Sequence, residues 1–102
     1  MEVATSVGGV PIRLTDERWE HILDARDDLA GLSAAVLRTV ADPDVVVEAK
    51  KGALQALKGG IIGKTMVVVY RELSQSDGFI ITAWLTNRPE RLLRRRVVWT
   101  QQ

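Results

Sequence analysis

The stretch VVVEAKKGALQALKGGIIGKTMVVVYRELSQSDGFIITAWLT, residues 45–86, decides the fold. It is rich in β-branched and aromatic residues that follow a period of two, which is typical of strands. Turn residues divide it into four expected strands, VVVEAKK, ALQALK, TMVVVYREL and GFIITAWLT. Gly52, residues 58–60 and residues 76–78 supply the connections. Consecutive hairpins of this kind predict an antiparallel meander.

Two amphipathic helices are expected before this stretch. Thr15 is a suitable N-cap for a first helix that runs to about Leu29. Its apolar face would carry Trp19, Ile22, Leu23 and Leu29. A second helix over residues 32–40 is expected to end at ADPD, because the residue before Pro43 is driven out of the helical region.

The predicted fold class is therefore α+β, with two N-terminal helices packed on one face of a four-stranded antiparallel sheet. The 102 residues suit one domain, residues 1–102. Within it, residues 1–14 would form the first part of the domain, and an edge strand is expected there at residues 10–14. The helical part would span residues 15–41, and the sheet with a basic C-terminal turn residues 44–102. The second sheet face would stay free.

The composition narrows the class of protein. The chain has no cysteine, which excludes disulfides and thiolate metal sites and indicates a reducing compartment. One histidine and scattered carboxylates form no recognisable metal-ligand cluster, so no metal and no cofactor are expected. The N-terminus lacks a secretory signal, and no stretch approaches the ~20 apolar residues of a membrane span. We expect a cytoplasmic protein without a membrane partner.

Charge is distributed unevenly along the chain. Residues 1–44 hold nine acidic and four basic residues, whereas residues 45–102 hold four acidic and ten basic residues, although the net charge is only +1. Such a chain could be polarised, with one face suited to an anion, or its two parts could attract each other in the fold.

The C-terminal segment NRPERLLRRR, residues 87–96, is strongly basic. It places five arginines within nine residues and only Glu90 among them: Arg88, Arg91, Arg94, Arg95 and Arg96. This density favours phosphate contacts that weaken with salt, and Lys50 and Lys51 could extend the patch. A solvated helix face is the alternative interpretation.

Two residues of the first expected helix could carry chemistry. His21 lies away from the apolar stripe, near Glu17 and Asp24 at helical spacing, and could be a general acid or base or a solvated surface residue. Arg26 falls in the apolar stripe one turn beyond Ile22, where a charge needs a partner or a function. Its side chain could reach a site beside the sheet, or its stem could cover the core while its head stays in water.

The sheet supplies a second group of candidates. Period two places Tyr70 and Glu72 on one face and Arg71 on the other. In the last expected strand, one face carries Thr82, Trp84 and Thr86, and the other carries Phe79, Ile81, Ala83 and Leu85. The apolar set is expected to pack on the helices. The threonines, Tyr70 and Glu72 could then surround a substrate, with Trp84 as a stacking platform. An ordinary solvated sheet face would give the same pattern.

Several segments together resemble a known family: WEHI, the DPD break, KKGALQAL, VVVYREL, GFIITAWLT and RPERLLRRR. They are similar to the small phage-associated nucleases of the barnase–EndoU–colicin–RelE superfamily, and more distantly to RelE-like toxins of the BrnT type. The resemblance covers residues 12–99. It implies a two-helix cap on a four-stranded sheet and metal-independent RNA cleavage. Carried over by position, its site residues would be His21, Lys51, Tyr70, Arg71, Thr82 and Arg88.

The leading hypothesis is thus a ribonuclease, the toxin of a toxin–antitoxin or related conflict system, with RNA and an antitoxin protein as partners and a homodimer left open. Cleavage would be transphosphorylation, with His21 or Glu72 as base or acid and Tyr70 as a proton carrier. Phosphoryl charge would be stabilised by Lys51, Arg26, Arg71 and Arg88. Many relatives carry a second histidine where this chain has Arg26. This departure favours the alternative, a non-catalytic RNA-binding or protein-interaction module.

Overall fold

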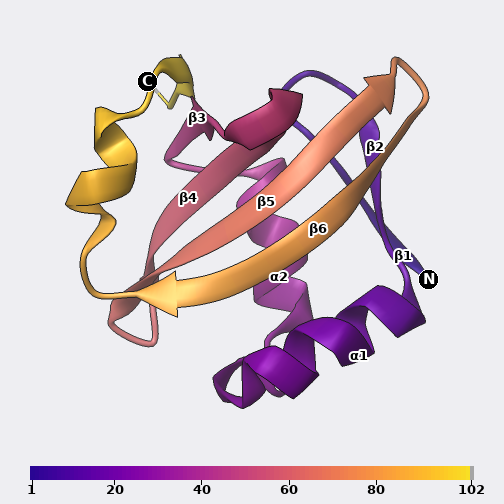
Figure 1. The fold of residues 1–102 in the computed structure, drawn as a ribbon. Helices are drawn as coiled ribbons and strands as arrows, with labels where there is room; N and C mark the ends of the chain where they lie inside the picture. Colours follow the sequence, from indigo (N-terminus) through magenta and orange to yellow (C-terminus); the bar gives the residue numbers. More distant parts are fainter. Residues whose placement is uncertain (102) are drawn as a thin grey trace.

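The computed structural model describes residues 1–101 and has the expected α+β class. The helices are α1 (Asp16–Ala25) and α2 (Ser33–Ala41), with three short 3-10 helices, η1 (Asp27–Leu29), η2 (Lys50–Gly52) and η3 (Pro89–Arg94). The strands are β1 (Glu2–Thr5), β2 (Pro11–Leu14), β3 (Val45–Glu48), β4 (Leu54–Ile61), β5 (Lys64–Ser74), β6 (Asp77–Thr86) and β7 (Val97–Thr100). Within residues 1–101 they form one sheet in the order β1-β2-β6-β5-β4-β3-β7 (Figure 1).

The prediction of a four-stranded antiparallel sheet was wrong in its details. The meander β3-β4-β5-β6 is present, but β7 adds to β3, and the hairpin β1-β2 adds to β6 with β2 parallel to it. The strand expected at residues 10–14 is therefore not the edge, because β1 covers it. Each of the three added strands has four residues, too few for a clear period-two signal.

An ion pair fastens the added hairpin to the meander. Arg13 on β2 donates two hydrogen bonds to Asp77 on β6, at 2.8 and 3.1 Å. The hydrogen bonds and the charge of Asp77 raise the pKa of Arg13, and hydrogen bonding by Arg13 lowers the pKa of Asp77. Both side chains are partly exposed, so the pair fixes register more than it adds stability.

The helix boundaries follow local capping. The Thr15 side chain accepts a hydrogen bond from the Arg18 backbone N–H at 3.1 Å, which confirms it as the N-cap. The first helix ends at Ala25 instead of continuing to Leu29, because two consecutive aspartates are poor interior helix residues. The 3-10 turn η1 follows and still buries Leu29 completely.

Both α-helices cover one face of the sheet, and Figure 1 shows α2 behind β4, β5 and β6. The core between these layers includes Ile22, Leu29, Val36, Val40, Val68 and Ile80, all at most 3% exposed. The opposite sheet face, called here the open face, has only a small apolar cluster. It consists of Val47, Leu57 and Val67, with Val45, Trp84 and Leu92 packed against them.

A β-bulge in β6 changes which of its side chains face the helices, compared with the expected set. Val69 pairs with Thr82, but the next residue of β5, Tyr70, pairs with Ile80, so Ile81 is an extra residue. In the part of β6 before the bulge, the two sets of side chains therefore lie on the faces opposite to those expected. Ile80 packs on the helices in place of Phe79 and Ile81, whereas Ala83 and Leu85 face the core as predicted.

Tyr70 allows a direct test of this packing. Its side chain is fully buried, and its hydroxyl has no hydrogen-bond partner among residues 1–101. Because an unpaired buried hydroxyl is unfavourable, Tyr70→Phe should leave the free energy of unfolding unchanged or raise it by up to about 1 kcal/mol. Tyr70→Ala should cost about 3–5 kcal/mol. Urea unfolding measures both, and a clear loss in Tyr70→Phe would contradict this packing.

Candidate functional site

The C-terminal helix η3 lies over the open face. Pro89 occupies its first turn, and Leu92 packs on the small cluster formed by Val47, Leu57 and Val67. After η3 the chain returns to the sheet, where β7 pairs with β3. The arginine-rich segment is thus held against the sheet by one apolar side chain and by the strand that follows it.

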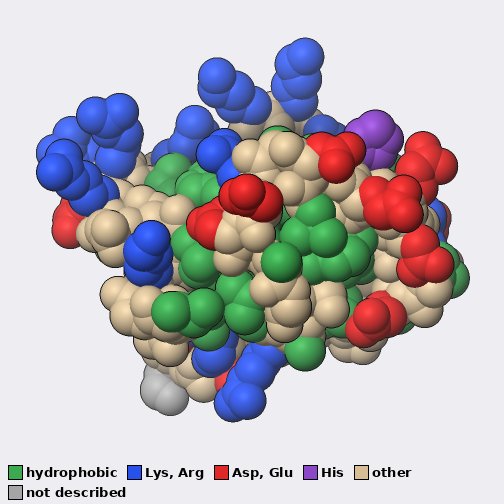
Figure 2. Space-filling view, turned by 90° about the horizontal axis from the view of Figure 1, so that it is seen from below, with side chains coloured by type: hydrophobic (Ala, Val, Ile, Leu, Met, Phe, Trp, Pro, Cys, Tyr) green, Lys and Arg blue, Asp and Glu red, His purple; other side chains and the backbone are tan. Residues whose placement is uncertain are grey.

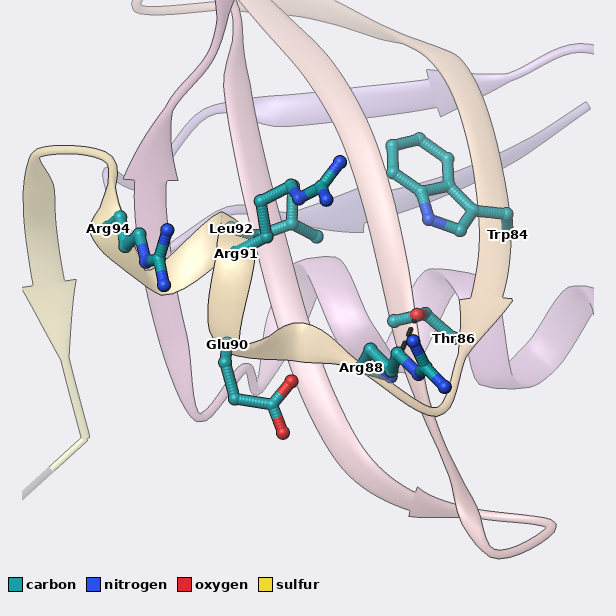
Figure 3. Close-up of a pocket in the computed structure, with 7 residues that line it drawn as sticks. All are labelled: Trp84, Thr86, Arg88, Glu90, Arg91, Leu92 and Arg94. Carbon is teal, nitrogen blue, oxygen red and sulfur yellow. Dashed lines mark hydrogen bonds between the residues drawn. The ribbon is translucent and has the colours of Figure 1, made fainter.

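A pocket of about 530 Å³ lies between η3 and the end of β6. Its lining residues are Trp84, Thr86, Arg88, Glu90, Arg91, Leu92 and Arg94 (Figure 3). The Thr86 hydroxyl accepts a hydrogen bond from the Arg88 backbone N–H at 3.0 Å and shapes the turn at the pocket. Three of the lining side chains are cationic, and Glu90 is the one carboxylate among the described residues that line it.

Trp84 and η3 face each other across this pocket. In Figure 3, Arg91 and Leu92 extend from η3 over the strands toward Trp84, whereas Arg94 lies toward the far end of η3. Trp84 is half-buried, so part of its ring stays available. The pocket therefore has a flat aromatic surface on one side and the positive charges of arginine side chains on the other.

The open face continues away from the pocket as a strip of mixed polar and apolar side chains. The cross-strand pairs Arg71–Phe79, Val69–Thr82 and Val67–Trp84 place Arg71, Thr82 and Trp84 on the same face. The Arg71 guanidinium reaches η2, because its Nη1 lies 3.4 Å from the place that a Cβ on Gly52 would occupy. Arg71 therefore connects the strip to Lys50 and Lys51, the exposed residues of η2.

The strip is long enough for several units of a polymer. The row of Arg71 lies six residue steps along β5 from the row of Thr65, which pairs with Thr86 beside the pocket. At ~3.4 Å per residue, this distance is about 20 Å. Positive side chains lie at both ends, on η2 and on η3.

Tyr70 and Glu72 do not join this strip, which corrects the expected grouping around Trp84. Both face the helix side of the sheet, as the pairing of Tyr70 with Ile80 requires. Burial and the nearby charge of Glu72 raise the pKa of Tyr70 well above its usual value, so its hydroxyl stays protonated at neutral pH. Glu72 accepts a hydrogen bond of 2.5 Å from the Ser6 hydroxyl in the β1–β2 loop.

His21 and Arg26 are also separate from the pocket lining. They belong to α1 and its C-cap, and α1 packs on the face of β6 opposite to η3. The side chain of His21 is 64% exposed, and its nearest charged partner is Glu17 at 4.0 Å. Arg26 is exposed instead of lying in the apolar stripe, because the helix ends before it.

Gln55 is a residue of the open face that the sequence reasoning missed. It is 6% exposed, and its side-chain oxygen has no hydrogen-bond partner among residues 1–101. It pairs with Val69 and Val47, in the same row as Thr82. A lone amide among the apolar residues of ALQAL was the signal that could have identified it.

The acidic and basic residues, which are unevenly distributed along the chain, also lie at different ends of the molecule. Figure 2 shows basic side chains gathered at the left end, where Figure 1 places η3, and acidic side chains at the right end, where it places α1. Arg95 is half-buried and does not line the pocket, and Arg96 lies 3.5 Å from Glu48. Within residues 1–101 no group of three His, Cys, Asp or Glu could hold a metal, and no helix could cross a membrane.

Leu92 is expected to control the position of η3. Leu92→Ala should lower the free energy of unfolding by about 1 kcal/mol, because a half-buried side chain is removed. It should also increase quenching of Trp84 fluorescence by acrylamide, measured with Trp19 and Trp99 replaced by Phe. Leu93→Ala is the matched control, since Leu93 is 44% exposed on the same helix. Equal effects of the two variants would refute the anchoring role of Leu92.

No family model, curated protein or solved structure matches this chain. The chemistry of the open face is therefore inferred from its own side chains, above all from Trp84 and the arginines of η3.

Proposed function

We propose that this protein binds single-stranded RNA on the open face, with the pocket at η3 as the principal contact. The supporting observation is that Trp84 and three arginines line one pocket, together with a single carboxylate among its described residues. Arginine binds phosphate oxygens through its planar fork, and an indole ring stacks on an unpaired base. The pocket brings both kinds of contact within reach of one nucleotide.

A single strand fits this surface better than a duplex. An aromatic ring recognises a base only when that base is unstacked, and paired bases present edges instead of ring faces. The strip from Arg71 to Thr86 extends the surface by about 20 Å along the direction of β5 and β6. This length suits a site of about four nucleotides, with phosphates near η3 at one end and near η2 at the other.

The proposal predicts a graded loss of salt dependence. Arg88→Ala, Arg91→Ala and Arg94→Ala should each reduce the slope of log K against log salt concentration by about 0.7, because each removes one phosphate contact. Fluorescence anisotropy with a labelled single-stranded RNA measures these slopes. Arg18→Ala, an exposed arginine on α1, is the matched control and should leave the slope unchanged.

Trp84 should contribute to affinity without contributing to the salt slope. Trp84→Ala should weaken binding by about 1–3 kcal/mol at every salt concentration, because one stacking contact is lost. A duplex of the same sequence should compete poorly. If the Trp84 and arginine variants all bind RNA like the unmodified protein, the proposal fails.

Glu90 favours a second candidate function, metal-independent RNA cleavage, which the resemblance to RelE-like and barnase-like nucleases also implies. Glu90 lines the same pocket as Arg88 and Arg91, so a carboxylate and cations belong to one site. In Figure 3 its carboxylate lies on the side of Arg88, whereas Arg91 extends toward Trp84. The carboxylate would take the proton of a 2′-hydroxyl, the oxygen would attack phosphorus, and the leaving 5′-oxygen would take a proton from water. A cleaving protein would act as the toxin of a toxin–antitoxin system.

Cleavage and binding can be separated in one experiment. Glu90→Gln should abolish strand breaks but keep RNA binding, because the amide cannot accept the proton. His21→Ala should leave cleavage intact, since His21 is exposed on α1, away from the pocket lining. Gel analysis of a labelled oligonucleotide and growth after induced expression report the outcome. Salt-sensitive binding without strand breaks would exclude the enzyme and keep the binding function.

A further inference from the structure

The turn between β4 and β5 holds an isoleucine in a backbone conformation that isoleucine rarely adopts. Ile62 has φ +52° and Gly63 has φ +72°, between the paired residues Ile61 and Lys64. Two-residue turns with positive φ at both positions usually carry Asn-Gly or Asp-Gly. A β-branched residue there is strained by about 1–2 kcal/mol. Burial within residues 1–101 does not compensate this strain, because Ile62 is 70% exposed.

A pocket of about 480 Å³ lies directly beside this turn. It is bordered by α2 and by the end of β4, and its lining residues are Ala34, Ala35, Arg38, Lys58, Gly59, Gly60 and Ile61. The pairing of β4 with β5 is irregular between Lys58 and Ile61, where Gly60 has φ +79°. Gly59 and Gly60 of this bulge contribute backbone to the wall, and α2 contributes the small side chains of Ala34 and Ala35, so the pocket offers room for an aliphatic group.

The charges around this pocket have both signs. Lys58 donates to the Asp42 backbone oxygen at 2.8 Å and lies 3.4 Å from its carboxylate. Asp44 is exposed and accepts a hydrogen bond from the Gly59 N–H at 2.8 Å. Arg38 is exposed and forms no ion pair within residues 1–101. Two copies of this surface can therefore match opposite charges, whereas two arginine-rich η3 surfaces would repel each other.

We propose that this surface joins two copies of the chain, with Ile62 of each copy seated in the α2–β4 pocket of the other. The protruding side chain and the pocket lie next to each other, so a two-fold axis beside the turn satisfies both contacts at once. Figure 1 shows the β4–β5 turn at the lower left of the molecule.

A second copy explains these features better than an unrelated partner does. The strain at Ile62 costs stability in the monomer and is offset only when the side chain becomes buried. The pocket that can bury it is lined by two alanines, two glycines and Ile61 together with the cations Arg38 and Lys58, and with Asp42 and Asp44 nearby its charges can complement themselves under two-fold symmetry. The surface is separate from the RNA pocket, with which it shares no lining residue. The dimer therefore does not depend on the proposed RNA binding.

The test is the mass of the protein in solution as its concentration is raised. Sedimentation equilibrium should show a monomer–dimer transition for the unmodified chain in the micromolar range, since the surface is small. Ile62→Asn should weaken the dimer by at least about 100-fold, because two buried side chains are lost per dimer and each is worth about tenfold or more. The same variant should unfold at equal or higher urea, since asparagine tolerates the turn better.

A second variant tests the pocket independently of the turn. Ala34→Glu keeps a good helix former on α2 but places a charge in the pocket, and it should also give a monomer. Mixing it with Ile62→Asn should restore part of the dimer, because one intact side chain then meets one intact pocket. Leu73→Asn, at a 55% exposed leucine outside the pocket lining, is the control and should dimerise normally. A monomeric unmodified chain, or an Ile62→Asn variant that dimerises normally, would overturn the proposal.

Discussion

The pairing of β5 with β6 is the constraint on which the other features depend. These are the two longest strands, and their register decides which of their side chains face the helices and which face the open side. The bulge at Ile81 allows both ends of β6 to bury apolar residues although the alternation changes midway. Without it, Phe79 and Ile81 would face the helices and Ile80 would lie on the open face. The bulge therefore determines which polar side chains remain on the open face.

The two faces of the sheet are stabilised very differently. The helix-covered face buries most of the apolar surface, including the complete side chain of Tyr70. The open face has a cluster of three buried residues, and Leu92 is the residue of η3 that packs against it. Such a cluster holds η3 against the sheet without covering the strip from Arg71 to Thr86 beside it. The arginines of η3 can therefore stay near Trp84 and still reach a ligand.

The two surfaces differ in charge and shape. Three arginines line the pocket at η3, and two such basic ends would repel each other, whereas the β4–β5 turn combines an exposed aliphatic residue with charges of both signs. Ile62 departs from the usual turn chemistry, and such departures concentrate where a protein contacts something else. The proposed RNA binding and the proposed self-association are therefore compatible in one small domain, because the two pockets share no lining residue.

The sequence by itself determined the class of the fold, the four strands of the meander, the Thr15 cap and the basic C-terminal segment. These features depend on local periodicity, capping and composition, which can be read within a few residues. Only the tertiary structure decided that Tyr70 is buried, that Arg26 is exposed and that three short strands extend the sheet. Those outcomes depend on pairing between distant segments: one extra residue in β6 reverses a face, and a four-residue strand is stabilised only by its neighbour.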